Sequence, residues 1–485
     1  EVNVLLIQPP QPPAAVRSRS SLEAQRPEGV AERPAFSPPW SLLCLNAYLQ
    51  QRTRHAPFLI DARFFSNLET DIAEYVRQLP EAQVAVVEAT TTGLGQVMQI
   101  LDVLKRSFPR LVTALCGQHA SQFPAQALTL PRVDFVLAGD PEPILHSLLD
   151  NFDTPTRLKR TPGLLYGDSE SQTASWLNDL NSLSLPEGHG FFWSAYAGRP
   201  GSGGCRLEVR LTRGHTRCPA DRAFGGAGIP LRAWRPERLA GFIQKTSDKG
   251  VSHFLLTDPP GVWTPERLAE WCRMLVRQRN SIPWSMQLLP THLSEPAVHS
   301  MAQAQCRTVG FIFPSCEPDV LKKYGCLLGP GDLDDTFALL REYGIRPQSE
   351  FWAGGPEEPA GEHRRLARAL RHLKFKDFSL ELFPCRPDAP LYRELRGQGA
   401  PKLEDWIRWA CDPWNHERPL AVWGGPDQVA VWDQQFQRLL RGAQRSMFRR
   451  FADLLQRTRA ALAQRNPWAP PAPHPTTPPP PPGPS

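Results

Sequence analysis

The sequence has no long hydrophobic run, no block of like charges and no regular cysteine spacing. None of its apolar stretches approaches the roughly eighteen residues that cross a bilayer, and its first residues lack the basic flank of a secretory signal. We therefore expect a cytoplasmic protein without a membrane span. The net charge is +6, but Lys and Arg alternate with Asp and Glu, which gives no nucleic-acid signal. Ten scattered cysteines exclude a disulfide framework.

Proline is abundant instead. The chain has 52 prolines, many of them between residues 9 and 39 and between 467 and 484. A hydrophobic fraction of 41% is enough for packed cores, and 485 residues predict two or three domains. Residues 466–485 predict a disordered proline-rich tail, because a charge-free, proline-rich segment cannot pack a core. Residues 391–465, with several tryptophans, predict a helical C-terminal region.

Short apolar runs alternate with amphipathic stretches over the first 150 residues. The runs predict buried strands that end at proline, glycine, hydroxyl or acidic residues. They cover 2–7, 58–61, 84–87, 111–115 and 133–137. The stretches between them predict helices, among them 97–107 and 124–130. This order predicts an α/β domain over about 1–150 with a doubly wound parallel sheet, whose ligand lies at the carboxyl ends of the strands.

A second alternating series follows a weakly patterned connector at 151–204. Its predicted strands are 205–211, 253–257, 283–288, 307–313, 346–352 and 377–382. Its predicted helices are 236–247, 265–278, 295–304, 332–343 and 362–373. Six strands with helices between them are too few for an eightfold barrel, so residues 205–390 predict an open, partial (β/α) barrel.

Several predicted strand ends carry short sequence motifs that occur together in one family. In the first domain these are Thr90 to Thr92, the segment Leu115-Cys116-Gly117-Gln118-His119-Ala120, and the segment from Val133 to Glu142. In the second they are 249–258, 282–285, 343–346 and 351–358. Over residues 2–395 the chain resembles cobalamin-binding radical S-adenosylmethionine (SAM) enzymes. The alternative interpretation of the motifs in the first domain is that they are tight turns of a flavodoxin-like sheet.

The resemblance implies cobalamin, SAM and a [4Fe-4S] cluster as cofactors. The residues it implies for cofactor binding are Thr90, Thr91, Thr92, Gly117, Gln118, His119, Gly139, Asp140, Glu142 and Ser315. The family signature Asp-x-His-x-x-Gly is missing, because Asp61-Ala62-Arg63 has no histidine. We therefore expect cobalamin without a cobalt ligand from that motif.

The cluster motif departs most from the family. Typical members place three cysteines after the first barrel strand, because three thiolates must hold three irons and leave the fourth for SAM. Here His215, Cys218 and Asp221 stand in that loop, and one residue is missing between the first two. In the segment 311–317, Pro314 and Cys316 flank Ser315 where the family has a Glu-Ser-Gly that contacts the nucleoside.

Three functions remain open from the sequence. The first is a degenerate family member that keeps cobalamin or substrate binding without normal cluster-dependent cleavage. The second is an active, methyltransferase-type enzyme on an unknown substrate. The third is a metal-dependent barrel enzyme in which His215, Cys218 and Asp221 bind an ion such as zinc, since imidazole, thiolate and carboxylate are all possible ligands. The alternative for these three residues is that they are ordinary polar loop residues.

Overall fold

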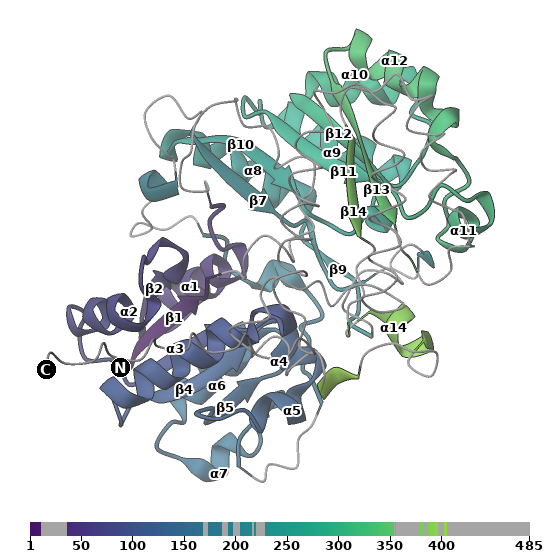
Figure 1. Ribbon diagram of the computed structural model, residues 1–485. Coiled ribbons are helices and arrows are strands. Elements are labelled where there is room, and N and C mark those ends of the chain that lie inside the picture. Colours follow the sequence, from purple (N-terminus) through teal and green to yellow (C-terminus); the bar gives the residue numbers. More distant parts are fainter. Residues whose placement is uncertain are drawn as a thin grey trace, which may run out of the picture.

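The fold consists of two bodies, each built on its own sheet (Figure 1). The computed structural model describes residues 1–10, 36–167, 173–186, 193–196, 204–215, 218–219, 228–353, 355, 378–382, 387, 389–395 and 402–404. No helix in this part of the chain is long and apolar enough to cross a membrane. The predicted helix 362–373, nearly all of the C-terminal helical region and the proline-rich tail lie outside the described residues.

The first sheet has the strand order β2-β1-β3-β4-β5-β6. Its strands are β1 (Asn3–Gln8), β2 (Ala56–Asp61), β3 (Val84–Glu88), β4 (Val112–Cys116), β5 (Phe135–Leu137) and β6 (Leu164–Leu165). The first five are parallel, and β6 runs antiparallel to β5. These strands are apolar on both faces because helices cover both, as in parallel sheets generally.

Alternate residues of β1 show the two covered faces. Val4 and Leu6 pack with α1 (Trp40–Arg52) and α6 (Pro141–Asp150), whereas Leu5 and Ile7 face the opposite side. The helices on that side are α2 (Leu68–Arg77), α3 (Leu94–Ser107), α4 (Gln118–Gln122) and α5 (Pro124–Leu128). The predicted doubly wound sheet is confirmed.

The connector belongs to both bodies. Its first half holds α7 (Pro155–Leu158) and β6, and Ser175 forms a bridge with Gly139 that extends the first sheet. Leu180, Leu183 and Leu185 pack instead in the core of the second body. The sequence pattern did not reveal this division, because β6 has only two residues and the Ser175 bridge only one.

The second sheet has the order β14-β13-β12-β11-β10-β7, and its described strand pairs are all parallel. Its strands are β7 (Cys205–Val209), β10 (Val251–Leu256), β11 (Trp284–Leu288), β12 (Cys306–Phe313), β13 (Arg346–Ala353) and β14 (Phe378–Leu382). Among the described residues β7 and β14 form the two edges and do not pair with each other, which confirms the open, partial barrel.

Helices cover the outer face of this sheet. They include α8 (Pro236–Thr246), α9 (Pro265–Arg277), α10 (Glu295–Gln303) and α12 (Asp334–Glu342). Local sequence sets where they start: in α9, Thr264 accepts a hydrogen bond from the Arg267 amide and Pro265 occupies the first turn. The last described helix, α14 (Pro390–Leu395), follows β14, and Tyr392 packs in the core of the first body.

Among the elements that were not predicted from the sequence, three short ones lie in the second body. Two are β8 (Thr212–Arg213) and β9 (Arg232–Ala233), which pair antiparallel and frame the loop that carries His215 and Cys218. The third is α11 (Pro318–Lys323), directly after the segment with Ser315. Elements of two to six residues are too short for a period of 2 or 3.6 to be recognised.

Candidate functional site

The loops after β3, β4 and β5 meet at the carboxyl edge of the first sheet. The amide of Ala89 donates to the carbonyl of Cys116 at 2.8 Å, and the amide of His119 donates to the carbonyl of Ala89 at 2.9 Å. The amide of Gly139 donates to Ser121 Oγ at 3.0 Å. The structure therefore brings together the three loops that the sequence singled out. Thr90 is exposed, and Thr92 and Gln118 are partly exposed, on this edge.

His119 lies inside the domain rather than on this edge. Its side chain is fully buried, its Nδ1 is 3.0 Å from Thr91 Oγ1, and its Nε2 is 2.5 Å from Gln126 Oε1. Both ring nitrogens are thus engaged by the protein itself. Thr91 and His119 hold the β3 and β4 loops together, and a direct contact of either with a cofactor stays a prediction.

The glycines of these loops are required by the backbone around them. Gly117 has φ of 93°, and a Cβ atom built there would lie 3.0 Å from the Ala89 carbonyl oxygen. Gly139 has φ of 118°, and a Cβ atom there would overlap the backbone of Ser175. Both conformations disfavour any residue with a side chain. Neighbouring backbone therefore accounts for both glycines, and their contact with a corrin ring stays a prediction.

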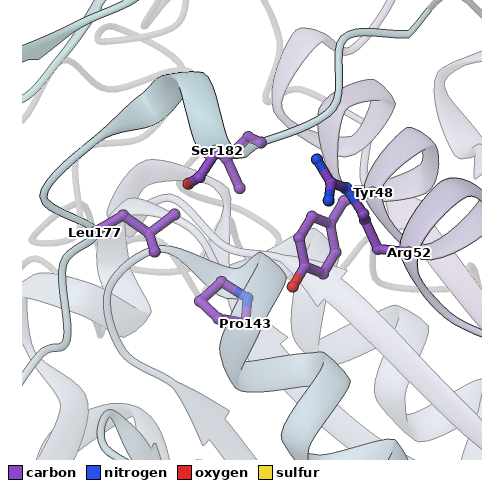
Figure 2. Close-up of a pocket in the computed structure, with 6 residues that line it drawn as sticks. Tyr48, Arg52, Pro143, Leu177 and Ser182 are labelled. Atoms are coloured by element: carbon purple, nitrogen blue, oxygen red, sulfur yellow. The ribbon is translucent and has the colours of Figure 1, made fainter.

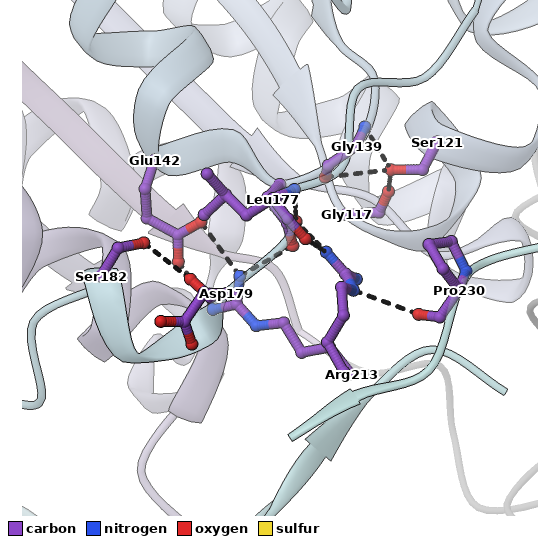
Figure 3. A network of polar contacts seen from close by, with 11 residues as sticks. Gly117, Ser121, Gly139, Glu142, Leu177, Asp179, Ser182, Arg213 and Pro230 are labelled. Carbon is purple, nitrogen blue, oxygen red and sulfur yellow. Dashed lines mark hydrogen bonds and ion pairs between the residues drawn. The ribbon is translucent and has the colours of Figure 1, made fainter. Parts of the chain in front are cut away.

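Asp140 and Glu142 lie in a buried ion cluster between the two bodies (Figure 3). Arg213, on β8, donates to both carboxylate oxygens of Glu142, at 2.6 and 3.0 Å, and to Asp140 at 3.0 Å. Arg232, on β9, pairs with Asp140, which also accepts from the Leu177 amide at 2.8 Å. We call these four charged side chains the charged link.

The charged link keeps Arg213 protonated. Burial alone would lower the pKa of Arg213, but the neighbouring carboxylates of Glu142 and Asp140 raise it well above its usual range. Two carboxylates and two guanidinium groups balance one another in charge, which a buried cluster needs. Asp140 and Glu142 therefore have a structural role that the resemblance did not indicate.

A second contact between the bodies lies at the end of β2. Asp61 accepts from Arg63 at 2.8 and 2.5 Å, and the Tyr196 hydroxyl donates to Asp61 at 2.7 Å. The amide of Glu208, on β7, donates to Ser37 Oγ at 2.7 Å. We call this set the neutral link, because only uncharged donors cross in it. Arg63 occupies the position of the missing histidine and bonds to Asp61.

The loop between β8 and β9 is narrow at its base. Gly214 has φ of 100°, and a Cβ atom there would overlap the carbonyl of Pro230. The His215 amide donates to the carbonyl of Ile229 at 3.2 Å. Asp258 holds the strand before the loop, since it accepts from the Thr212 amide at 2.7 Å. Burial raises the pKa of Asp258, and the hydrogen bonds from Thr212 and Leu211 oppose that shift.

His215 and Cys218 are both partly buried, and Asp221 lies outside the described residues. Within the described part of the chain no group of three or more His, Cys, Asp or Glu side chains is placed to hold a metal ion. The three-residue metal site therefore stays a prediction. Ser315 is fully buried, and its hydroxyl accepts from the Glu317 amide at 3.0 Å, which fixes the turn into α11.

Glu88 is a candidate that the sequence analysis missed. It ends β3, beside Gly117, and it is partly buried at the sheet edge. Burial raises the pKa of Glu88, while its hydrogen bond with Ser41 and the charge of Arg210 oppose that rise. A carboxyl group that ends an apolar run of four valines and alanines is a signal that the sequence did contain.

The inner face of the second sheet carries polar side chains that the sequence analysis also missed. Gln287 donates to Glu350 at 3.0 Å, and the indole of Trp352 donates to the same carboxylate at 2.9 Å. His253 Nε2 lies 2.9 Å from Ser285 Oγ, and burial lowers the pKa of His253 to about 4. Polar residues at every second position of otherwise apolar strands are the signal that marks this face.

The described residues also form a small, half-open pocket of about 130 Å³ near the start of α6 (Figure 2). Its lining residues are Tyr48, Arg52, Pro143, Leu177, Ser182 and Leu183. An open groove of about 700 Å³ lies next to it and shares Ser182. Neither the pocket nor the groove is lined by a site residue that was predicted from the sequence. Neither of them is therefore the candidate site at the carboxyl edge of the first sheet.

No protein-family model matches this sequence, and no curated protein matches it. Among solved structures, the radical SAM methyltransferase TsrM from Kitasatospora setae with cobalamin and a [4Fe-4S] cluster bound is 16% identical, with a TM-score of 0.64 over 96% of this chain and 100% of TsrM. TsrM with tryptophan substrate and a SAM analogue bound is 17% identical, with a TM-score of 0.63 over 82% and 77% of the two chains.

The cobalamin-dependent SAM radical enzyme OxsB, with aqua-cobalamin and SAM bound, is 15% identical. Its TM-score is 0.57, and the match covers 84% of this chain and 56% of OxsB. The chain therefore has the fold of cobalamin-dependent radical SAM enzymes, and the predicted resemblance is confirmed at the level of the fold. At these identities the chemistry has to be argued from the residues of this chain.

Proposed function

We propose that this chain is a degenerate protein of the cobalamin-dependent radical SAM type, which binds a corrinoid at the carboxyl edge of its first sheet without assembling a normal [4Fe-4S] cluster. The observation that carries the proposal is the match along the whole length of TsrM, a structure with cobalamin and a [4Fe-4S] cluster bound. The residues at the two cofactor positions then decide which cofactor this chain retains.

The first sheet edge fits a corrinoid. Thr90, Thr92 and Gln118 present hydroxyl and amide groups there, which are suited to the amide side chains of a corrin ring. A bound corrinoid supplies a cobalt centre that carries methyl groups. The donor set predicts that cobalt receives no imidazole from the edge, because His119 is buried in internal hydrogen bonds and Arg63 stands where the family has its histidine.

The second sheet edge does not fit a conventional cluster. Three thiolates are needed, and the loop from Gly214 to Pro230 contains one cysteine, Cys218. His215 and Asp221 offer an imidazole and a carboxylate, which are poor substitutes for sulfur on a reduced cluster. No reaction step that depends on such a cluster is therefore proposed for this chain.

A second candidate is an active, methyltransferase-type enzyme on an unknown substrate. The specific observation in its favour is that the match extends to TsrM with tryptophan and a SAM analogue bound, across 82% of this chain. A metal-dependent enzyme with His215, Cys218 and Asp221 remains a third candidate, with no observation in the described residues that favours it.

Anaerobic purification of the full chain tests the first proposal against the second. We expect retained corrinoid after incubation with hydroxocobalamin, well under one [4Fe-4S] cluster per chain by iron and sulfide assay, and no 5′-deoxyadenosine with dithionite and SAM. Stoichiometric cluster with an EPR signal that shifts on adding SAM would restore the active enzyme. Zinc in place of iron would favour the third candidate.

A matched pair of variants tests the location of the corrinoid. Thr92→Val removes a partly exposed hydroxyl from the sheet edge, and we expect weaker hydroxocobalamin binding in a spectral titration. Thr129→Val removes an exposed hydroxyl just after α5, which donates to the carbonyl of Gln126, and should leave binding unchanged. Equal affinities for both variants would show that the corrinoid does not contact Thr92, and absence of any binding would refute the corrinoid proposal.

A further inference from the structure

Two cysteines far apart in the sequence lie on segments that touch. Cys218 and Pro219 belong to the loop between β8 and β9, and Gly325 and Cys326 follow Tyr324, the C-cap of α11. A Cβ atom built on Gly325 would lie 3.4, 3.5 and 3.6 Å from Pro219 Cδ, Cγ and Cβ. The proline ring therefore packs on the glycine, and each of these two residues is the chain neighbour of a cysteine.

The glycine permits this approach. Gly325 has φ of 72°, a conformation that side-chain-bearing residues rarely adopt, and its missing side chain leaves room for the proline ring. Consecutive Cα atoms are about 3.8 Å apart, so both cysteines lie within one residue of the contact. A disulfide needs the two Cα atoms about 4.4–6.8 Å apart, so the two segments that meet at Pro219 and Gly325 must bring Cys218 and Cys326 to that separation when the bond forms.

The two thiols also influence each other electrostatically. Cys326 is 2% exposed and belongs to a buried apolar cluster with residues of β12, α11, β13 and α14. Burial is the main reason that its pKa is raised, to about 12, and the neighbouring charge of Cys218 adds to the rise. Cys218 itself is partly exposed, and both residues are present as thiols in the structure.

We propose that Cys218 and Cys326 form a reversible disulfide, which fastens the loop between β8 and β9 to the end of α11. The oxidant is a small disulfide such as glutathione disulfide. The Cys218 thiolate attacks one sulfur of glutathione disulfide and releases one glutathione. The Cys326 thiol loses its proton to solvent and attacks the sulfur of Cys218, which releases the second glutathione. Two thiols and one glutathione disulfide thus give one protein disulfide and two glutathione molecules.

A second cysteine pair provides an internal comparison. The charge of Cys272 contributes to the raised pKa of Cys306, so these two thiols also lie near each other. However, they are 1% and 0% exposed in the core between the second sheet and its helices. A small oxidant reaches neither of them, because buried structural cysteines are inert. The partial exposure of Cys218 therefore distinguishes the pair that we expect to react from the buried pair of Cys272 and Cys306.

The disulfide has a direct effect on the loop that replaces the cluster motif. Cys218 is the one cysteine of residues 214–230, so its oxidation removes the single soft ligand that this segment offers to a metal. The loop is already fixed at its base by Gly214 and Pro230, and the disulfide adds a second anchor. The inference does not depend on corrinoid binding, which involves the other sheet.

Peptide mapping of the full chain tests the proposal. The reduced protein is freed of reductant, incubated over a range of glutathione disulfide to glutathione ratios, quenched with acid, alkylated and digested. We expect a linked peptide that contains Cys218 and Cys326, that disappears on reduction, and that forms equally in Cys316→Ser. Cys272 and Cys306 should remain alkylated as thiols at every ratio.

The two single variants give different products if the mechanism is correct. In Cys326→Ser, Cys218 should accumulate as a glutathione mixed disulfide, because no second thiol resolves it. In Cys218→Ser, Cys326 should stay a thiol, because the oxidant does not reach it. The proposal is overturned by the absence of the linked peptide at all ratios in the wild-type protein, or by a link from Cys218 to Cys316 instead. Since wild-type mapping needs no variant, poor folding of Cys326→Ser does not affect that outcome.

Discussion

The charged link and the neutral link join the same two bodies in different ways. In the charged link, Arg213 and Arg232 reach from the second body to carboxylates of the first. In the neutral link, the ion pair of Asp61 and Arg63 lies within the first body, and what reaches it from outside is the Tyr196 hydroxyl. The bodies are therefore joined by buried charge at one place and by neutral hydrogen bonds at the other.

This difference determines what a substitution leaves behind. Removing one member of the charged link leaves an uncompensated charge in a buried interface, which costs far more than the lost hydrogen bond itself. Removing a neutral donor from the other link leaves the Asp61–Arg63 pair intact. Stability measurements on the two links should therefore differ in size, although each link makes several hydrogen bonds.

The largest effect is expected for Glu142→Ala. The guanidinium of Arg213 then loses its bidentate partner inside the interface, and the free energy of unfolding should fall by about 3–5 kcal/mol. Urea unfolding followed by tryptophan fluorescence measures the change. Glu81→Ala, at an exposed position, serves as the control. The double variant Glu142→Leu with Arg213→Leu should recover much of the loss, and a double variant as unstable as the single one would contradict this account.

Gly139→Ala should have the next largest effect, because it disturbs the turn that carries Asp140 without removing a charge. The new Cβ atom overlaps the Ser175 backbone and the φ of 118° is strained, so we expect a loss of about 2–3 kcal/mol. Gly331→Ala, where a Cβ atom meets nothing within 4 Å, is the matched control. Equal unfolding midpoints in urea for the two variants would show that the close approach of the Ser175 backbone to Gly139 does not matter for stability.

The pH dependence of stability tests His253, a buried group of the second body that belongs to neither link. Burial and the charge of Arg206 lower the pKa of His253 from 6.5 to about 4, so below pH 6.5 the unfolded chain binds a proton that the native chain excludes. The stabilisation is full above pH 6.5 and is lost as the pH falls towards 4, by up to about 2 kcal/mol between pH 7 and pH 5. His253→Gln should flatten this dependence, and the exposed His292→Gln should not.

The smallest effect is expected for Tyr196→Phe in the neutral link. This variant loses one hydrogen bond to Asp61 and keeps the ring packed on Phe64, so the loss should be about 1 kcal/mol. Tyr343→Phe, which removes an exposed hydroxyl bond to Glu295, is the control and should change the unfolding midpoint less. A loss as large as that of Glu142→Ala would remove the distinction between the two links.

The sequence predicted both sheets because their strands are buried on one or both faces. Runs such as Val84–Val87 and 307–313 have the apolar composition of parallel strands, and the structure places β3 and β12 over them with changes of one residue at the ends. The short β8, β9 and α11 were missed, since their identity depends on neighbours far along the chain. Periodicity carries information about burial, which is why it predicted the layers well.

The site was predicted less well, because its contacts join distant positions. Glu142 and Arg213 are 71 residues apart, and no local pattern links an acidic residue at the start of one helix to an arginine beyond the connector. Gly117 and Gly139 were predicted from the sequence to contact a ligand. The structure shows that neighbouring backbone passes so close to both positions that each requires a glycine. A glycine marks a close approach, and the sequence does not tell what approaches.

The order in which the chain is synthesised affects when the core of the first body is completed. The first five strands emerge from the ribosome before β6 and Ser175, which fix the turn at Gly139. The same first core is closed on one side by Ala389 and Tyr392, which are 2% and 5% exposed and follow the last strand of the second sheet. The first sheet therefore acquires these core contacts only after the strands of the second sheet have been synthesised, and a nascent chain that ends before Ala389 exposes the apolar surface that these two residues cover.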